Sequence, residues 1–140
     1  MATSAQYTST PGYSTTTATT ADTSYTSPTN IVTILTGPST AAGSGVGYRI
    51  SRAFAAVKGN SSAGLLRIFT SSDNGTTKQF VAEYSVPAVT TSSTTPAATL
   101  AIPILEGLTI PGATGGNPFL VYATTSITQN IAIHIYYGAL

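Results

Sequence analysis

The sequence predicts an all-β protein: an antiparallel, jelly-roll-like β-sandwich of about eight short strands with an extended N-terminal arm. Three observations predict this fold. From residue 31 onward, short runs rich in Ile, Val and aromatic residues alternate with clusters of Gly, Pro, Ser and Thr. No window of helical length shows a 3.6-residue apolar period bounded by capping residues. The length of 140 residues suits one domain, whose common size is about 100–150 residues.

The first 30 residues form a separate zone, which we interpret as the arm. Sixteen of them are Ser or Thr, Asp22 is the only charge, and Val, Ile, Leu and Phe are absent. Such a segment buries too little apolar surface to offset its ordering entropy. Its tyrosines, Tyr7, Tyr13 and Tyr25, are rigid amphipathic side chains, and we expect them to anchor the arm on a neighbouring subunit. The arm (residues 1–30) is therefore predicted to precede a sandwich domain of residues 31–140.

The strands of the sandwich are expected at residues 31–36, 48–58, 64–71, 78–86, 98–104, 107–110, 118–124 and 131–137. In the last of these, alternation places Ile131, Ile133 and Ile135 on one face and His134 with Tyr136 on the other.

The turn signal Asp73-Asn74-Gly75-Thr76 predicts a hairpin between the third and fourth of these strands. A two-residue Asn-Gly turn would pair residues whose numbers sum to 149 and would mix apolar with polar faces. Burial of one face favours the sum of 150, with the sum of 148 as its competitor, because a one-residue slip turns the strand over. The favoured register sets Arg67 opposite Glu83 as an ion pair, in a hairpin whose three- or five-residue loop has Gly75 at positive φ. Its inner face would combine Leu66 and Ile68 with the even positions Phe80, Ala82, Tyr84 and Val86.

Charge is scarce, and this excludes several kinds of partner. Charged residues make up 6% of the chain, against about 25% in ordinary domains, and the net charge is +1. All five basic residues lie between positions 49 and 78, and alternation would place Arg49 and Arg52 on opposite faces of one strand. We therefore expect no nucleic-acid partner and no membrane association.

The residues that could perform chemistry are few. The chain has no cysteine, one histidine (His134) and four carboxylates (Asp22, Asp73, Glu83 and Glu106), none in a catalytic or metal-ligand spacing. The glycine-rich residues 43–47 precede a strand, so they predict a loop and no phosphate cradle. We expect no enzyme activity, no cofactor and no metal. The N-terminus lacks the basic and apolar regions of a secretory signal. Either the chain acts without secretion, which we favour, or a signal has been removed.

Several turns and strand edges occur in a familiar order. They are Gly47-Tyr48-Arg49-Ile50, Ser62-Ala63-Gly64-Leu65-Leu66-Arg67-Ile68-Phe69, Asp73-Asn74-Gly75-Thr76, Glu83-Tyr84-Ser85-Val86-Pro87, Leu108-Thr109-Ile110-Pro111-Gly112 and Tyr136-Tyr137-Gly138. Over about residues 45–140 this order resembles small jelly-roll-like phage virion proteins of the head-decoration, cement or head-spike kind. The resemblance implies a non-enzymatic protein, made in the host cytoplasm, that clamps capsid subunits on the virion surface. It also implies a homotrimer that binds the major capsid protein, whereas the arm has no counterpart in the pattern.

Two alternatives stay open. A lectin-like or receptor-binding module at a spike or tail tip could use Tyr122, Tyr136 and His134 as an aromatic platform for sugars. A cell-surface or fimbrial subunit is the other, although it would need export. The mean hydropathy of +0.21 with so few charges favours a protein that works packed in an assembly.

Overall fold

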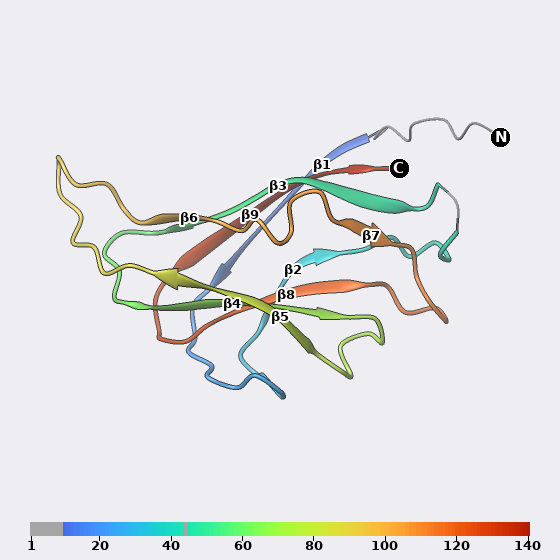
Figure 1. Cartoon of the computed structure of the whole chain (residues 1–140), viewed down its shortest axis with the longest axis horizontal. Helices are drawn as coiled ribbons and strands as arrows, with labels where there is room; N and C mark the ends of the chain where they lie inside the picture. Colours follow the sequence, from blue (N-terminus) through green and yellow to red (C-terminus); the bar gives the residue numbers. More distant parts are fainter. Residues whose placement is uncertain (1–9, 44) are drawn as a thin grey trace.

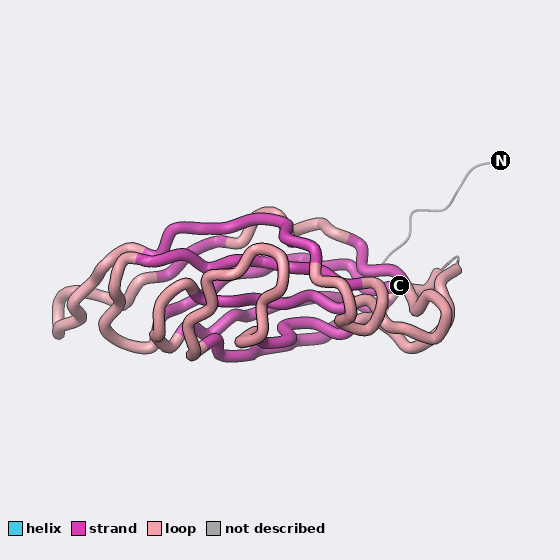
Figure 2. Tube along the Cα trace, turned by 90° about the horizontal axis from the view of Figure 1, so that it is seen from below, coloured by secondary structure: helices cyan, strands magenta, loops and turns pink. Residues whose placement is uncertain are grey.

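Two stacked β-sheets form the molecule, as a computed structural model that describes residues 10–43 and 45–140 shows (Figures 1 and 2). The described residues contain nine strands and no helix. The strands are β1 (Thr10–Ala18), β2 (Val32–Thr36), β3 (Gly47–Val57), β4 (Gly64–Ser71), β5 (Gln79–Val86), β6 (Thr99–Ala101), β7 (Thr109–Pro111), β8 (Leu120–Thr125) and β9 (Ile131–Ala139). All strand pairs are antiparallel.

The connectivity is jelly-roll-like. The first sheet has the order β1-β9-β3-β6, with β7 also paired to β3, and the second has the order β2-β8-β4-β5. Along the chain every connection crosses from one sheet to the other, except within the hairpin β4–β5 and between β6 and β7. This crossing pattern is typical of double-sheet jelly rolls. The predicted fold class is therefore confirmed.

Each of the eight expected strands is present, and β1 is an additional one. β1 pairs with β9 from Thr10 opposite Ala139 to Ala18 opposite Ile131, so the sandwich begins at Thr10 and not at residue 31. It lacks large apolar side chains because it lies at a sheet edge, above the edge strand of the other sheet. There Ser14 Oγ donates to Ile34 O (2.7 Å) and Thr16 Oγ1 donates to Thr33 O (3.0 Å). Hydroxyl side chains thus join the two sheets where a core strand would use isoleucine.

The core lies between the sheets and is filled mainly by aliphatic side chains. Ile131, Ile133 and Ile135 of β9 are fully buried, as alternation predicted, against Leu66 and Ile68 of β4. Burying each such side chain contributes about 1.5–3 kcal/mol, so the central strands carry most of the hydrophobic stabilisation.

The hairpin β4–β5 has the predicted register over most of its length. Arg67 lies opposite Glu83, and the pairs from Gly64 to Ile68 sum to 150. A β-bulge then leaves Val81 without a partner and sets Phe69 opposite Phe80. Phe80 is therefore on the outer face, which corrects the expectation that it shares the inner face, because a bulge reverses the alternation beyond it.

The hairpin loop is longer than expected. It spans residues 72–78 instead of three or five residues. Gly75 has φ 85°, as predicted, and Asn74 also has positive φ (59°). The loop is held by the Asp73 carboxylate, which accepts from Thr77 N (2.8 Å) and from Ser71 Oγ (2.7 Å). A Cβ on Gly75 would lie 2.6 Å from the hydroxyl of Tyr122, so space as well as backbone conformation requires glycine here.

The segment between β1 and β2, residues 19–31, covers part of the outer face of the second sheet. Asp22 N donates to Thr125 O (2.8 Å), which fixes the segment beside β8. Beneath it Phe69, Leu120 and Tyr122 form a second apolar cluster with Ile31. The outer face of this sheet is thus partly a core, and most of the zone that composition marked as an arm belongs to the sandwich of its own chain.

Candidate functional site

The structure places the predicted arm anchors on the chain's own sandwich. Tyr13, on β1, has its hydroxyl 2.6 Å from His134 Nδ1. Tyr25 lies against the outer face of the second sheet, and its hydroxyl donates to Glu83 Oε2 (2.9 Å). Tyr7 lies outside the described residues. The two described tyrosines remain about half exposed, at 49% for Tyr13 and 44% for Tyr25.

Four rings gather on the outer face of the first sheet: Tyr13 of β1, Phe54 of β3, and His134 and Tyr136 of β9. We call this surface the aromatic face. The ring centroids of Phe54 and His134 are 4.9 Å apart and those of His134 and Tyr13 are 5.9 Å apart, both pairs stacked within 20° of parallel. Tyr136 packs at 4.9 Å against Tyr13, and the guanidinium of Arg52 lies 5.0 Å from the Phe54 centroid. The strand register creates this row, since Phe54 lies opposite His134 and Tyr13 opposite Tyr136.

The aromatic face differs from the platform that the sequence suggested. His134 and Tyr136 do share it, but Tyr122 is buried in the second sheet beneath residues 19–31. Burial, with a smaller contribution from the negative charge of Asp73, raises the pKa of the Tyr122 hydroxyl. Within the row, the stacked rings turn their faces toward one another and leave fewer faces for a sugar ring. Such a row of aromatic and guanidinium groups is typical of protein–protein contacts.

A second bulge brings both arginines of β3 to this side. The register shifts between Ile50 and Arg52, so Arg49, opposite Gly138, and Arg52, opposite Tyr136, both point outward. This corrects the expectation from simple alternation that they lie on opposite faces. Arg52 and Phe54 also line a groove of about 320 Å³ with Glu106, which lies between β6 and β7.

The predicted ion pair between Arg67 and Glu83 is present, with Arg67 Nε 3.1 Å from Glu83 Oε2. Arg67 is buried (4% exposed) and has further partners in residues 19–31. It donates to Asp22 O and to the Tyr25 hydroxyl, both at 3.1 Å, and its guanidinium lies 4.3 Å from the Tyr25 ring centroid. These contacts satisfy the buried charge and fasten the covering segment to β4, so the pair is structural.

Asp22 organises the same covering segment. Its carboxylate accepts from the backbone N–H groups of Ser24 (2.9 Å), Thr29 (2.7 Å) and Asn30 (2.8 Å). Burial acts to raise the pKa of this carboxyl group, but these hydrogen bonds outweigh it and lower the pKa below 3.8. Hydrogen bonds from Thr77 and Ser71 lower the pKa of Asp73 to about 2.

Acid is therefore expected to weaken the fold between about pH 4 and pH 2. Both carboxyl groups have a lower pKa when folded, so their stabilisation is present above the unfolded pKa and is lost as the pH falls through the folded one. Urea unfolding at pH 6, 4, 3 and 2 measures this loss. Asp22→Asn should cost about 1–3 kcal/mol at pH 6 and should flatten part of the acid slope, because at least one of the three backbone donors would face an amide N–H₂ group. Lys58→Met, which removes an exposed charge away from residues 19–31, is the control, and an unchanged slope in Asp22→Asn would contradict the role of Asp22.

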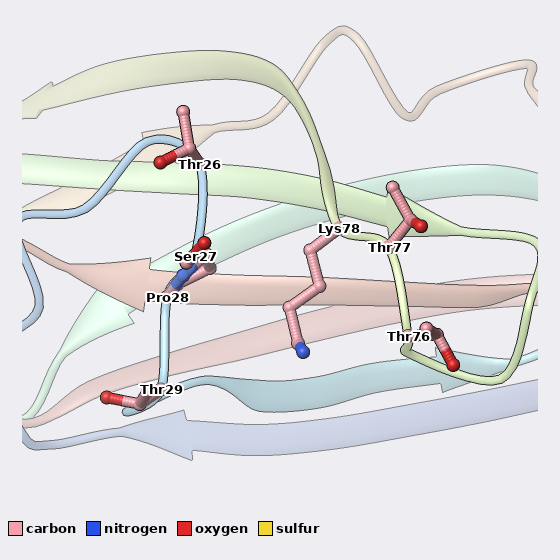
Figure 3. A pocket seen from close by; sticks show the side chains of 7 residues that line it. All are labelled: Thr26, Ser27, Pro28, Thr29, Thr76, Thr77 and Lys78. Atoms are coloured by element: carbon pink, nitrogen blue, oxygen red, sulfur yellow. The ribbon is translucent and has the colours of Figure 1, made fainter.

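Residues 19–31 and the hairpin loop together form a polar cleft of about 250 Å³. It is lined by Thr26, Ser27, Pro28, Thr29, Thr76, Thr77 and Lys78 (Figure 3). Lys78 extends between the two segments, and its Nζ donates to Gly75 O (2.8 Å). Two carboxylates outside the cleft fix its walls by hydrogen bonds: Asp22 accepts from Thr29 N, and Asp73 accepts from Thr77 N. An ammonium group and several hydroxyls in a pre-formed cleft can bind a small polar ligand.

Within the described part of the chain, no helix is long and apolar enough to cross a membrane. Residues 10–43 and 45–140 also contain no group of three or more His, Asp or Glu side chains arranged to hold a metal ion. Comparison with models of protein families, with curated proteins and with solved structures gives no match. The likeness to phage virion proteins thus rests on the sequence pattern alone.

Proposed function

We propose that this chain is a non-enzymatic structural protein of a virus particle, a capsid decoration or cement protein. In this role it acts as a homo-oligomer, expected to be a trimer, and binds the major capsid protein so that one molecule spans neighbouring subunits. Contacts to several subunits at once raise the cost of separating any of them, because the second contact is intramolecular. The sequence pattern and the jelly-roll-like fold support this proposal, since jelly rolls occur in viral capsid domains.

The observation that carries the proposal is the aromatic face. Aromatic residues and arginine are enriched in interface cores, where Lys, Asp and Glu are depleted. The three strands β1, β3 and β9 have two charged residues between them, Arg49 and Arg52, and no carboxylate. An exposed face of this composition suits a surface that another protein covers.

The native mass of the purified chain in dilute neutral buffer tests the proposal first. Wild type is expected near three times the chain mass of 14.2 kDa, about 43 kDa. Replacing Tyr13 and Tyr136 together by serine should shift the mass toward 14.2 kDa, because it removes two exposed rings from the centre of the contact. Phe80→Ser is the matched control, since Phe80 is similarly exposed (40%) on the other sheet and should leave the mass unchanged.

A lectin-like or receptor-binding module is the second candidate, and the polar cleft favours it. Lys78 and the hydroxyls of Thr26 and Thr76 could donate to a saccharide, and lectin domains also use jelly rolls. A wild-type mass of 14.2 kDa at all concentrations would remove the homo-oligomer and give this candidate priority. Glycan-array binding that disappears in Lys78→Met would then support it, and an array without hits would remove it.

A further inference from the structure

Two charged groups beside the aromatic face have no ionic partner among residues 10–43 and 45–140. Arg52 contacts the ring of Phe54, and Glu106 Oε1 accepts one long hydrogen bond, from Ala53 N at 3.4 Å. They line the same groove, yet the one ion pair among residues 10–43 and 45–140 is Arg67–Glu83. Arg52 and Glu106 are thus a cation and an anion that line one groove without forming an ion pair with each other.

We propose that the aromatic face is the contact between copies of this chain, in which Arg52 of one copy pairs with Glu106 of the next. The inference rests on the proposed homo-oligomer and names its surface. Charge complementarity argues for a second copy as the occupant. An acidic partner would suit Arg52 and the nearby Arg49 but repel Glu106, and a basic partner would suit Glu106 but repel both arginines. Around a three-fold axis, each copy would present Arg52 to Glu106 of one neighbour and Glu106 to Arg52 of the other, so copies of this chain supply both opposite charges.

The size of the face agrees with this occupant. The first sheet is four strands wide along the β1-β9-β3-β6 path, with neighbouring strands about 4.8 Å apart. Its length is that of the nine residues of β9, at about 3.3 Å each. The projected area of the face is therefore roughly 600 Å². Side chains that protrude from the sheet add to this area, and a stable interface buries about 800 Å² per partner. The aromatic row would form the apolar centre, and the Arg52–Glu106 pair at the groove would fix the orientation of the copies.

Charge reversal tests the pair directly. Arg52→Glu and Glu106→Arg should each weaken self-association at least about tenfold in Kd, measured by analytical ultracentrifugation over a concentration series, because each places like charges together. The double variant Arg52→Glu/Glu106→Arg should recover the wild-type Kd. Lys78→Glu makes the same charge change in the hairpin loop of the second sheet and should leave the Kd unchanged. Urea unfolding of all variants verifies that each one folds.

A mixing experiment separates pairing between copies from pairing within one copy. ¹⁵N-labelled wild type and the unlabelled double variant are unfolded together, refolded and examined by native mass spectrometry. If Arg52 and Glu106 meet between copies, mixed oligomers would juxtapose like charges, so we expect the two proteins to sort into separate oligomers. Statistical mixing would overturn the inference and leave the proposed function standing, whereas a monomeric wild type would remove the homo-oligomer itself.

Discussion

Deletion of residues 1–30 is expected to unfold the sandwich. The deletion removes β1 and so leaves the long edge of β9 unpaired from Ile131 to Ala139. It also removes the segment that covers Phe69, Leu120 and Tyr122, whose burial contributes about 1.5–3 kcal/mol each. Since small domains are stable by about 5–15 kcal/mol, the combined loss is comparable with the whole stability. Circular dichroism and urea unfolding of the truncated chain measure it.

Deletion of residues 1–9 is the matched control. It leaves the pairs of β1 with β9 from Thr10 to Ala18 in place, so we expect this shorter chain to fold. A folded and equally stable 31–140 fragment would contradict the structural role of β1. Because the longer deletion would lower particle binding through unfolding alone, a test of attachment to capsids needs the shorter one.

Alternating apolar residues mark the core strands in the sequence, whereas β1 carries no such pattern. Ile131, Ile133 and Ile135 mark β9 plainly because an inward-facing strand in the core needs large aliphatic side chains. β1 instead turns small residues such as Ser14 and Thr16 inward at a sheet edge, where hydroxyl-to-carbonyl bonds replace apolar packing. Its high threonine content was the one local signal for extended chain. Its partner, β9, lies at the other end of the chain, and no local pattern reveals such a pairing.

Bulges account for the residues that the sequence analysis placed on the wrong face. Burial of one face predicts the hairpin register correctly, with Arg67 opposite Glu83, but alternation fails beyond Val81 and Phe80 faces outward. The bulge in β3 sets the buried positions Ile50 and Ala53 three residues apart instead of two. The sequence does not reveal it, because Phe54, four residues after Ile50, is the larger apolar side chain and yet faces outward beside His134.

The candidate site was predictable only in part. That His134 and Tyr136 share a face followed from alternation, and the structure agrees. Tyr13 and Phe54 joined them through pairings between distant strands, which depend on the complete sheet order. Local sequence thus defines which side chains point together along one strand, whereas topology decides which strands bring their outward side chains into one surface.

Replacement of Arg67 by methionine is expected to lower the free energy of unfolding by about 2–4 kcal/mol. The side chain is buried and joins β4 to Glu83, Asp22 and Tyr25, so its loss removes an ion pair, two hydrogen bonds and the contact with the Tyr25 ring. The cost should lie below the upper range for buried pairs, because the side chain of Glu83 is 34% exposed and water can solvate it. The urea midpoint, at constant slope, measures the change.

Three further measurements test whether Arg67 holds residues 19–31 against the second sheet or only stabilises the core. Lys58→Met, the control at an exposed lysine, should change stability by no more than about 0.5 kcal/mol. Glu83→Gln should cost less than Arg67→Met, since Arg67 would keep its bonds to Asp22 O and to the Tyr25 hydroxyl. Limited proteolysis should cut Arg67→Met first within residues 19–31, because local opening precedes global unfolding where the fewest contacts remain. If Arg67→Met lowers the free energy of unfolding by less than about 1 kcal/mol and leaves cleavage unchanged, Arg67 does not hold residues 19–31. Backbone pairing and the apolar cluster of Phe69, Leu120 and Tyr122 would then hold them.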